Sequence, residues 1–372
     1  MSINRGDMND GGSESASRLL ARRAADDVRA TRRFTAVIAD VRLDPADRMT
    51  ERELAMLRQT VEKLCALIEN DVRQFAARQL VARGLPEIAL TLTPPLAQGP
   101  GVSFAALAEA GCLAEPNFLR AMLQRVGTLL LAEDLPATAP AGGDQPSLLA
   151  RLSTDRDGVI ADAATALLAA DARRRDAVDG AAARGDLAAE DQHRLVWWVT
   201  AAVRRGLAPA DDQDRLAFDH ALTEAAARAL AVHDEGERTE AAAAKLVHVL
   251  SPAPLDRATL MVEALADQRV TLFIALLADA LGVGYDMAAA LVLEGAPERF
   301  WLALRAAGLD RAALAQIGFA LAEAGRHGPA EQLADQIDTI MSFNEDAARA
   351  AIGGALLHPD LDAALRALGG GR

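Results

Sequence analysis

The stretch that decides the fold begins at Asp256 and ends at Gly284, DRATLMVEALADQRVTLFIALLADALGVG. Here, and onward to Leu368, short runs of Ala, Leu, Val and Ile are broken at near-regular intervals by Gly and by Asp, Asn or Pro. Asp, Asn and Pro favour helix starts, and Gly favours helix ends. The pattern predicts short packed helices that start near Asp256, Gln268, Asp286, Pro297, Asp310, Pro329, Asn344 and Pro359.

These starts follow one another at intervals of roughly 11–19 residues, which is the spacing of short helices joined by tight connections. The intervals are too irregular for a strict repeat. Consecutive pairs of helices nevertheless resemble the units of a helical solenoid, in which each pair packs against the next.

Hydrophobic residues make up 51% of the 372-residue chain, but aromatic residues make up only 3%. The core must therefore consist largely of Ala and Leu side chains, which let helices lie close together. Ala is the strongest helix former. In no segment do apolar and polar residues alternate between turn residues, as they do in a half-buried strand. Composition and periodicity together predict an all-α fold.

The formal net charge of −14 lies entirely after Glu133, because basic and acidic residues cancel before that point. An acidic surface repels phosphate, so we expect no nucleic acid partner. Cys65 and Cys112 are too few for a disulfide framework or a zinc site. We see no signal peptide and no apolar run long enough to span a bilayer. The sequence therefore predicts a cytoplasmic protein without a cofactor or metal, for which membrane association is not expected.

Composition also divides the chain. Residues 1–12 are polar and predicted to be disordered. A helical domain is expected over residues 13–133, where Thr50 and Glu53 form a capping-box pattern. Residues 134–147 are rich in Pro and Gly and predict a linker. The predicted C-terminal helical domain covers residues 148–372, so we expect a protein in two parts.

Three segments resemble one family. They are Asp186–Arg204, with the sequence DLAAEDQHRLVWWVTAAVR, the upstream run Pro146–Arg175, and the later stretch Val270–Gly325. They are similar to an uncharacterised alphaproteobacterial family, domain-of-unknown-function family 2336. The resemblance covers Pro146 to the C-terminus and is weak over Glu51–Leu92. It implies an all-α, HEAT-like helical-repeat fold in the C-terminal domain and implies no activity.

Few residues carry recognisable chemistry. Glu190 and His193 form a Glu-x-x-His pair on one helical face, a unit that di-iron bundles use twice. It occurs once here, so a surface or inter-helix hydrogen bond of His193 is the favoured interpretation. Three acids resemble a cation cluster but lack the pattern of an EF-hand, and helix N-terminal acids explain them. They are Asp211, Asp212 and Asp214.

Two groups of residues are candidates for partner binding. The expected N-terminal helix is rich in Arg, and a basic amphipathic helix binds anionic lipid or an acidic partner unless it is merely a solvated face. Trp301 lines either a groove or the core. Trp197 and Trp198 form either a binding platform or part of a buried central helix. The Arg residues assigned to partner binding are Arg18, Arg22, Arg29 and Arg33.

We therefore expect a non-enzymatic cytoplasmic scaffold or adaptor that binds a protein or peptide partner, since stacked helices expose long binding surfaces. The alternative is a regulator that senses a small ligand or an anionic membrane surface through the Arg-rich N-terminal helix. The third possibility is an enzyme with an unfamiliar metal site at Glu190 and His193. A homodimer is possible.

Overall fold

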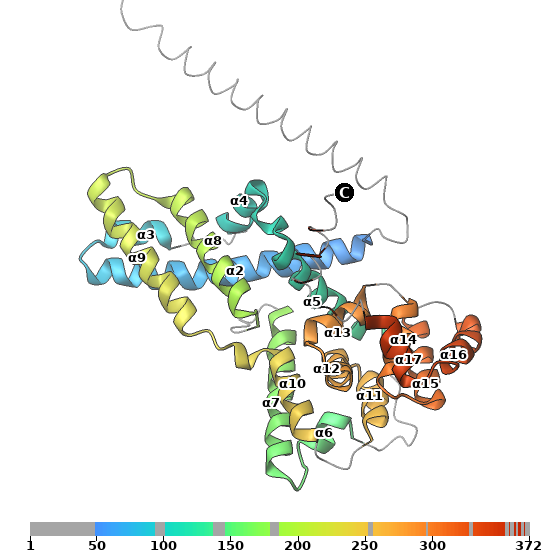
Figure 1. Cartoon of the computed structure of the whole chain (residues 1–372). Coiled ribbons are helices and arrows are strands. Elements are labelled where there is room, and N and C mark those ends of the chain that lie inside the picture. Colours follow the sequence, from blue (N-terminus) through green and yellow to red (C-terminus); the bar gives the residue numbers. More distant parts are fainter. Residues whose placement is uncertain are drawn as a thin grey trace, which may run out of the picture. The chain divides into compact units, whose positions relative to one another are not determined.

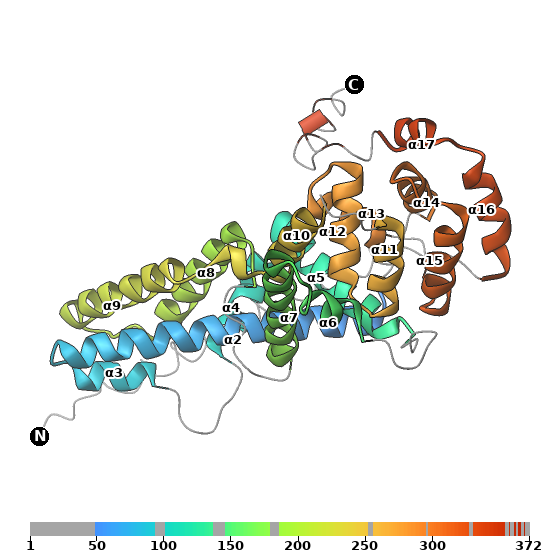
Figure 2. The same cartoon turned by 90° about the horizontal axis from the view of Figure 1, so that it is seen from below.

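The computed structural model describes residues 49–93, 101–136, 146–178, 186–251, 256–294, 297–326 and 330–353, with a few isolated positions beyond them. These residues form sixteen α-helices and no strand, so the predicted all-α fold is confirmed (Figures 1 and 2). Contacts divide the chain into a unit Met1–Leu54 and a unit Ala55–Arg372. The predicted disordered segment 1–12 and the N-terminal Arg residues lie outside the described residues, and the packing below is that of the second unit.

The long helices lie in the first half of the chain, among shorter ones, and the helices from α10 onward are all short. The first half contains α2 (Glu51–Ala82), α3 (Pro86–Leu92), α4 (Val102–Ala110), α5 (Pro116–Asp134), α6 (Leu148–Leu152), α7 (Gly158–Val178), α8 (Ala189–Leu207) and α9 (Asp212–Ala231). The second half contains α10 (Thr239–Leu250), α11 (Arg257–Ala266), α12 (Val270–Leu281), α13 (Tyr285–Leu293), α14 (Pro297–Ala306), α15 (Arg311–Glu323), α16 (Leu333–Met341) and α17 (Glu345–Ile352).

Local capping sets several of these helix starts. The side chains of Asp256, Asp310 and Asn344 accept hydrogen bonds from backbone N–H groups in the first turns of α11, α15 and α17. At the start of α2, the backbone N–H of Thr50 donates to Glu53 at 2.7 Å, and the backbone N–H of Glu53 donates to the Thr50 hydroxyl at 3.2 Å. These are the starts that the sequence predicted, and each satisfies donors that a helix leaves unpaired.

Two hydrophobic cores hold the second unit together. The α2 core is built from α2–α5 together with α8 and α9, and Phe118 and Phe218 are fully buried in it. The α12 core gathers the end of α5, then α6 and α7, and α10–α17 around Phe273. Both cores therefore contain residues from either side of segment 134–147. The predicted division of the chain at that segment stays a prediction, although the packing crosses it.

Helix α12 is the most deeply buried element of its core. Ten of its residues, from Val270 to Leu281, are buried. None of the described helices is by itself long and apolar enough to cross a membrane, and α12 and α13 qualify together only across a bend of 115°. A regular solenoid packs each unit only against the next, whereas α11 contacts α15 and α14 contacts α17. The HEAT-like description thus stays a prediction.

The three tryptophans have different environments. Trp301 is only 3% exposed and packs edge-on against Phe300, with ring centroids 5.3 Å apart. Its predicted partner-binding role is untested, but its burial favours the alternative of core packing. Trp198 packs edge-on against Phe118 at 5.8 Å. Trp197, its neighbour in α8, remains 36% exposed. Only part of α8 therefore behaves as the buried central helix.

A close approach of three helices occurs at Gly318 in α15. A Cβ atom there would lie 2.4 Å from Leu333 Cδ1 and 2.7 Å from Trp301 Cη2. Because helix packing is already dense, the added methyl group must displace both side chains. We expect Gly318→Ala to lower the free energy of unfolding by about 1–3 kcal/mol in urea titrations. Gly353→Ala, at a position with nothing within 4 Å of the added Cβ, is the control, and equal losses in both variants would contradict this account.

A carboxylate from one helix caps another within the α2 core. Glu69 of α2 is 3% exposed and accepts from the backbone N–H of Ser103 at 3.0 Å and from its hydroxyl at 2.6 Å, in the first turn of α4. Arg73 Nη1 donates to the same carboxylate at 2.8 Å. Burial alone would raise the pKa of Glu69, but the hydrogen bonds from Ser103, Arg73 and Val102 hold this pKa below its ordinary value of 4.5. The folded state therefore favours the charged form.

The cap makes stability dependent on pH. Since the folded pKa of Glu69 is lowered, its contribution is complete above the ordinary value of 4.5 and is lost as the pH falls through the folded pKa. We expect Glu69→Gln to cost about 1–3 kcal/mol at neutral pH and to flatten the acid limb of a stability profile measured by urea unfolding. The exposed Glu323→Gln should change neither. An unchanged acid limb in Glu69→Gln would disprove the assignment.

Candidate functional site

A cavity in which charged side chains gather has a volume of about 530 Å³. We call it the charged cavity. It is lined by one face of α5, by Arg174 of α7, by residues 186–191 and 194 at the start of α8, by residues around the start of α10, and by the first turn of α13. Helix α8 of the α2 core therefore meets α7, α10 and α13 of the α12 core here, and α5 contributes to both cores.

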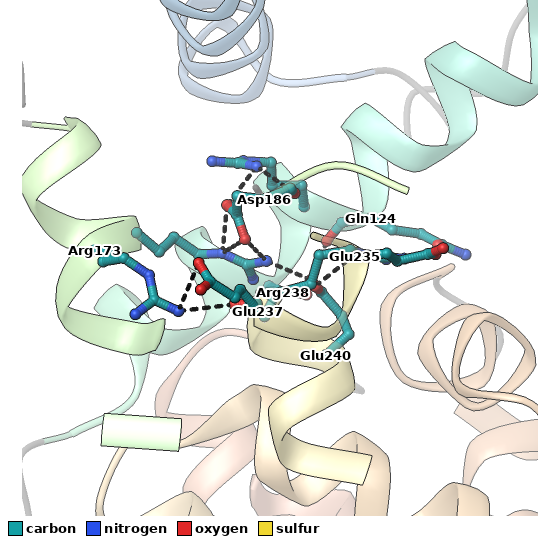
Figure 3. A network of polar contacts seen from close by, with 10 residues as sticks. Gln124, Arg173, Asp186, Glu235, Glu237, Arg238 and Glu240 are labelled. Carbon is teal, nitrogen blue, oxygen red and sulfur yellow. Dashed lines mark hydrogen bonds and ion pairs between the residues drawn. The ribbon is translucent and has the colours of Figure 1, made fainter. Parts of the chain in front are cut away.

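Asp186 is the centre of a buried ion-pair network beside this cavity (Figure 3). Its carboxylate accepts from Arg174 Nε at 2.9 Å and from Arg174 Nη2 at 2.7 Å, which is a forked pair. Arg125 Nη1 lies 2.5 Å from Asp186 Oδ2, the oxygen that also accepts from Arg174 Nε, and it donates to the Asp186 carbonyl at 3.1 Å. One carboxylate thus joins α5, α7 and the segment that leads into α8.

The network continues into α10 through Glu240. Arg174 Nη2 donates to Glu240 at 2.6 Å, and Arg238 Nε lies 3.6 Å from the second oxygen of that carboxylate. Arg238 Nη1 in turn donates to Glu235 at 2.9 Å. Figure 3 also shows Gln124 of α5, whose amide donates to the Asp286 carbonyl at 3.1 Å and so connects α5 with α13.

The buried charged groups of the network shift one another's pKa values. Burial alone would raise the pKa of Asp186, but Arg174 and Arg125 outweigh it and hold this pKa below its usual range. Burial would likewise lower the pKa of Arg174, yet Glu240 and Asp186 raise it well above the usual value. The pKa of Arg125 is lowered, because burial dominates and the neighbouring Arg174 repels its charge. The two guanidinium groups differ because Arg174 has two carboxylate partners and Arg125 has one.

Several donors of the cavity remain unused. Arg174 is 5% exposed and Arg125 is 8% exposed, yet Arg174 Nη1 and Arg125 Nε make no hydrogen bond among the described residues. The hydroxyl of Tyr285 is also buried without a well-formed hydrogen bond among the described residues, and Thr271 is its polar neighbour. Burial raises the pKa of the Tyr285 phenol, so the group stays protonated and can donate.

Three helix N-termini face the same cavity. The residues that precede α8, α10 and α13 are Ala188, Arg238 and Gly284, and none of them caps its helix with a side chain. All three line the cavity. The first turn of a helix carries unpaired N–H groups and about half a positive charge. The cavity is therefore surrounded by donors that favour a negatively charged group.

The charged side chains of the lining nearly balance. Its basic residues are Arg120, Arg125, Arg174, Arg194 and Arg238. Its acidic residues are Asp186, Glu190, Asp191, Glu235, Glu240 and Asp286. Asp186 is bound within the network, and Glu240 is bound through one oxygen, whereas its Oε2 makes no hydrogen bond among the described residues. The Glu190 and Glu235 side chains are 85% and 50% exposed at the rim. Burial raises the pKa of Asp191, which lies 3.5 Å from Arg194.

The residues singled out in the sequence for metal chemistry do not converge. Glu190 lies 3.8 Å from Arg194, and His193 Nε2 accepts from Trp197 Nε1 at 3.3 Å. No group of three or more metal-ligating side chains occurs in the described part of the chain. Asp211 caps α9 by accepting from the backbone N–H groups of the first turn, as predicted.

Cys65 is fully buried in the α2 core. Burial, with Glu69 and Glu62 nearby, raises the pKa of its thiol to about 12. A thiol this weakly acidic has almost no thiolate at neutral pH and is therefore a poor nucleophile. In the core this side chain acts as a small apolar group.

Sequence reasoning did not identify the network. Arg125 and Asp186 are 61 residues apart, and Arg174 and Glu240 are 66 residues apart. No local spacing links residues on four different elements. The available signal was weak, namely charged residues in otherwise apolar helical segments, since Arg125 precedes Val126 and Arg174 follows the Ala-rich stretch of α7.

The network predicts a large cost for removing its central charge. Asp186→Asn leaves two buried guanidinium groups short of a counter-charge, so we expect a loss of about 3–5 kcal/mol in the free energy of unfolding. Asp219→Asn is the matched control, because Asp219 also makes a forked pair with Arg204, but at an exposed site. It should cost less than about 1 kcal/mol. Similar urea midpoints for the two variants would refute the assignment.

Comparison with known proteins identifies a family whose members have no described activity. No curated protein and no solved structure matches the chain. The sequence profile of the bacterial family DUF2336, described as an uncharacterised protein conserved in bacteria, matches residues 141–353. This range covers more than half of the chain and includes Arg174, Asp186 and Glu240 of the network. By that match, and with its all-helical structure, the chain belongs to the family DUF2336.

Proposed function

We propose that this protein is a non-enzymatic interaction scaffold or adaptor that binds a protein or peptide partner. The observation that carries the proposal is the exposure of Trp197 on α8. Its indole is 36% exposed, whereas Val196 and Val199 on either side in the same helix are fully buried. Tryptophan is enriched among the side chains that dominate binding energies at protein interfaces.

The surroundings of Trp197 form a continuous stripe. His193, Trp197, Ala201 and Arg205 follow one another at intervals of four residues and are all exposed, so they lie on one face of α8. We call this stripe the α8 surface. Trp197 donates to His193 Nε2, and the two rings meet edge-on at 6.4 Å, which fixes the indole orientation. A preset aromatic side chain loses little conformational entropy on binding. An amphipathic helix suits such a surface, because its apolar side chains can pack on Trp197 and Ala201 while an acidic side chain meets Arg205.

The acid–base properties of four buried groups support binding over catalysis by those groups. General acid–base catalysis needs groups whose pKa lies near neutral pH. The thiol of Cys65 and the phenol of Tyr285 have raised pKa values, and the carboxyls of Glu69 and Asp186 have lowered ones, so all four move away from that range. Asp191 moves toward it, but it is paired with Arg194.

The α8 surface is tested by affinity capture of the full chain from its native cells. We expect a stoichiometric protein partner and a loss of at least about thirtyfold in partner affinity for Trp197→Ala, which is the size of an interface hot spot. Leu216→Ala is the matched control, because Leu216 is 73% exposed on the neighbouring helix α9. Circular dichroism verifies that both variants stay folded. A partner retained equally by Trp197→Ala, or no partner under several growth conditions, would contradict the proposal.

The alternative function, sensing of a small ligand or an anionic membrane surface through the Arg-rich N-terminal helix, stays a prediction of the sequence. The cytoplasmic location and the homodimer stay predictions as well. The role of Arg18, Arg22, Arg29 and Arg33 depends on residues outside the described ones.

A further inference from the structure

We infer that the charged cavity is a binding site for a small molecule that carries a single carboxylate group. The inference does not depend on the α8 surface, because Trp197 does not line the cavity. It follows from three properties of the cavity, which are its unused buried donors, its convergent helix N-termini and its charge balance.

The first property is the pair of buried guanidinium groups. Arg174 and Arg125 are both more than nine-tenths buried and line the cavity, and each keeps one N–H nitrogen without an acceptor among the described residues. A buried donor without an acceptor costs free energy. Both residues line the cavity, so a carboxylate bound there is the acceptor that these nitrogens lack. Arg forms forked pairs with carboxylates especially well.

The second property is independent of the first. The N-termini of α8, α10 and α13 point at one cavity, and each lacks a side-chain cap. These helices have 19, 12 and 9 residues, so each is long enough to bind an anion at its first turn. At α9 and α11 an acidic side chain, Asp211 or Asp256, holds the N-cap position itself. The helices α8, α10 and α13 carry acidic side chains only within their first turns, at Glu190, Asp191, Glu240 and Asp286. A carboxylate ligand would accept hydrogen bonds from the first-turn N–H groups that face the cavity, as the capping Asp side chains do at α9 and α11.

The third property selects the charge of the ligand. Six acidic and five basic side chains line the cavity, and three helix N-termini add about half a positive charge each. The summed charge of the lining is therefore slightly positive, and it suits a ligand with a single negative charge. A dianionic phosphate group would leave an excess of negative charge beside Asp186 and Glu240, which already occupy the strongest Arg donors.

The size of the cavity fits a small molecule. Its volume of about 530 Å³ lies within the range of known ligand pockets. The wall combines Met122, Leu187 and Met287 with the charged groups. Such a wall accepts an apolar body next to an acidic head group. The Tyr285 hydroxyl is available as a further donor to the carboxylate.

The inference is tested with matched probes on the full chain by isothermal titration calorimetry at constant ionic strength. Phenylacetate is compared with phenylacetamide, which has the same shape without the charge, and acetate is compared with inorganic phosphate. We expect phenylacetate to bind at least about tenfold more tightly than its amide, and acetate to bind more tightly than phosphate. Equal binding of acid and amide, or no binding of either acid in the millimolar range, would overturn the inference. Tighter binding of phosphate would overturn the choice of a carboxylate.

Two variants localise the binding without disturbing the network. Tyr285→Phe removes a hydroxyl that makes no well-formed hydrogen bond to the described residues. The fold should therefore be retained, while phenylacetate affinity falls roughly threefold to tenfold. Ala189→Glu places a carboxylate in the first turn of α8, which favours the helix and repels an anionic ligand. It should lower the affinity more than tenfold.

Ala201→Glu is the matched control for Ala189→Glu, because it adds the same charge to an exposed position of the same helix outside the cavity. It should leave phenylacetate binding unchanged. Thermal unfolding followed by circular dichroism checks that each variant is folded. Equal effects of Ala189→Glu and Ala201→Glu, or full affinity in a folded Tyr285→Phe variant, would place any binding elsewhere and refute this site.

Discussion

The carboxylate of Asp186 is the interaction on which the rest of the site depends. It binds Arg174 and Arg125 at once, and through Arg174 it is linked to Glu240. Removing it would leave two guanidinium groups, each more than nine-tenths buried, short of a counter-charge. The position of α5 relative to α7 and α10, and with it the shape of the charged cavity, is therefore set by an electrostatic contact at the junction of two apolar cores.

The helical fold was largely predictable because its determinants are local. The Thr50–Glu53 capping box and the N-caps Asp256, Asp310 and Asn344 each involve residues within three positions of one another. Such signals depend on the chain sequence alone. How the helices pack was less predictable. Small Ala and Leu side chains allow many pairings of similar helices, so the sequence did not reveal that α8 and α9 join the α2 core.

The site could not be predicted from spacing. Its parts come from α5, α7, α10, α13 and the segment before α8, and no motif spans such distances. The two tryptophans of α8 illustrate the same limit, because Trp197 and Trp198 are adjacent in sequence, yet one is exposed and the other packs on Phe118. Successive helical residues point about 100° apart. An almost uniformly apolar stretch therefore says little about which side chain will be covered.

The depth of the network also bears on why it exists. Well-packed apolar residues in place of a buried ion pair are often as stabilising or more so, because charges lose much of their hydration on burial. Stability alone therefore does not account for Arg125 and Arg174, which are buried between cores otherwise built from apolar side chains. Their arrangement beside a cavity, with donors unused and three uncapped helix N-termini nearby, is what an anion site requires. The physical argument thus favours recognition over stability as the reason for the buried charges.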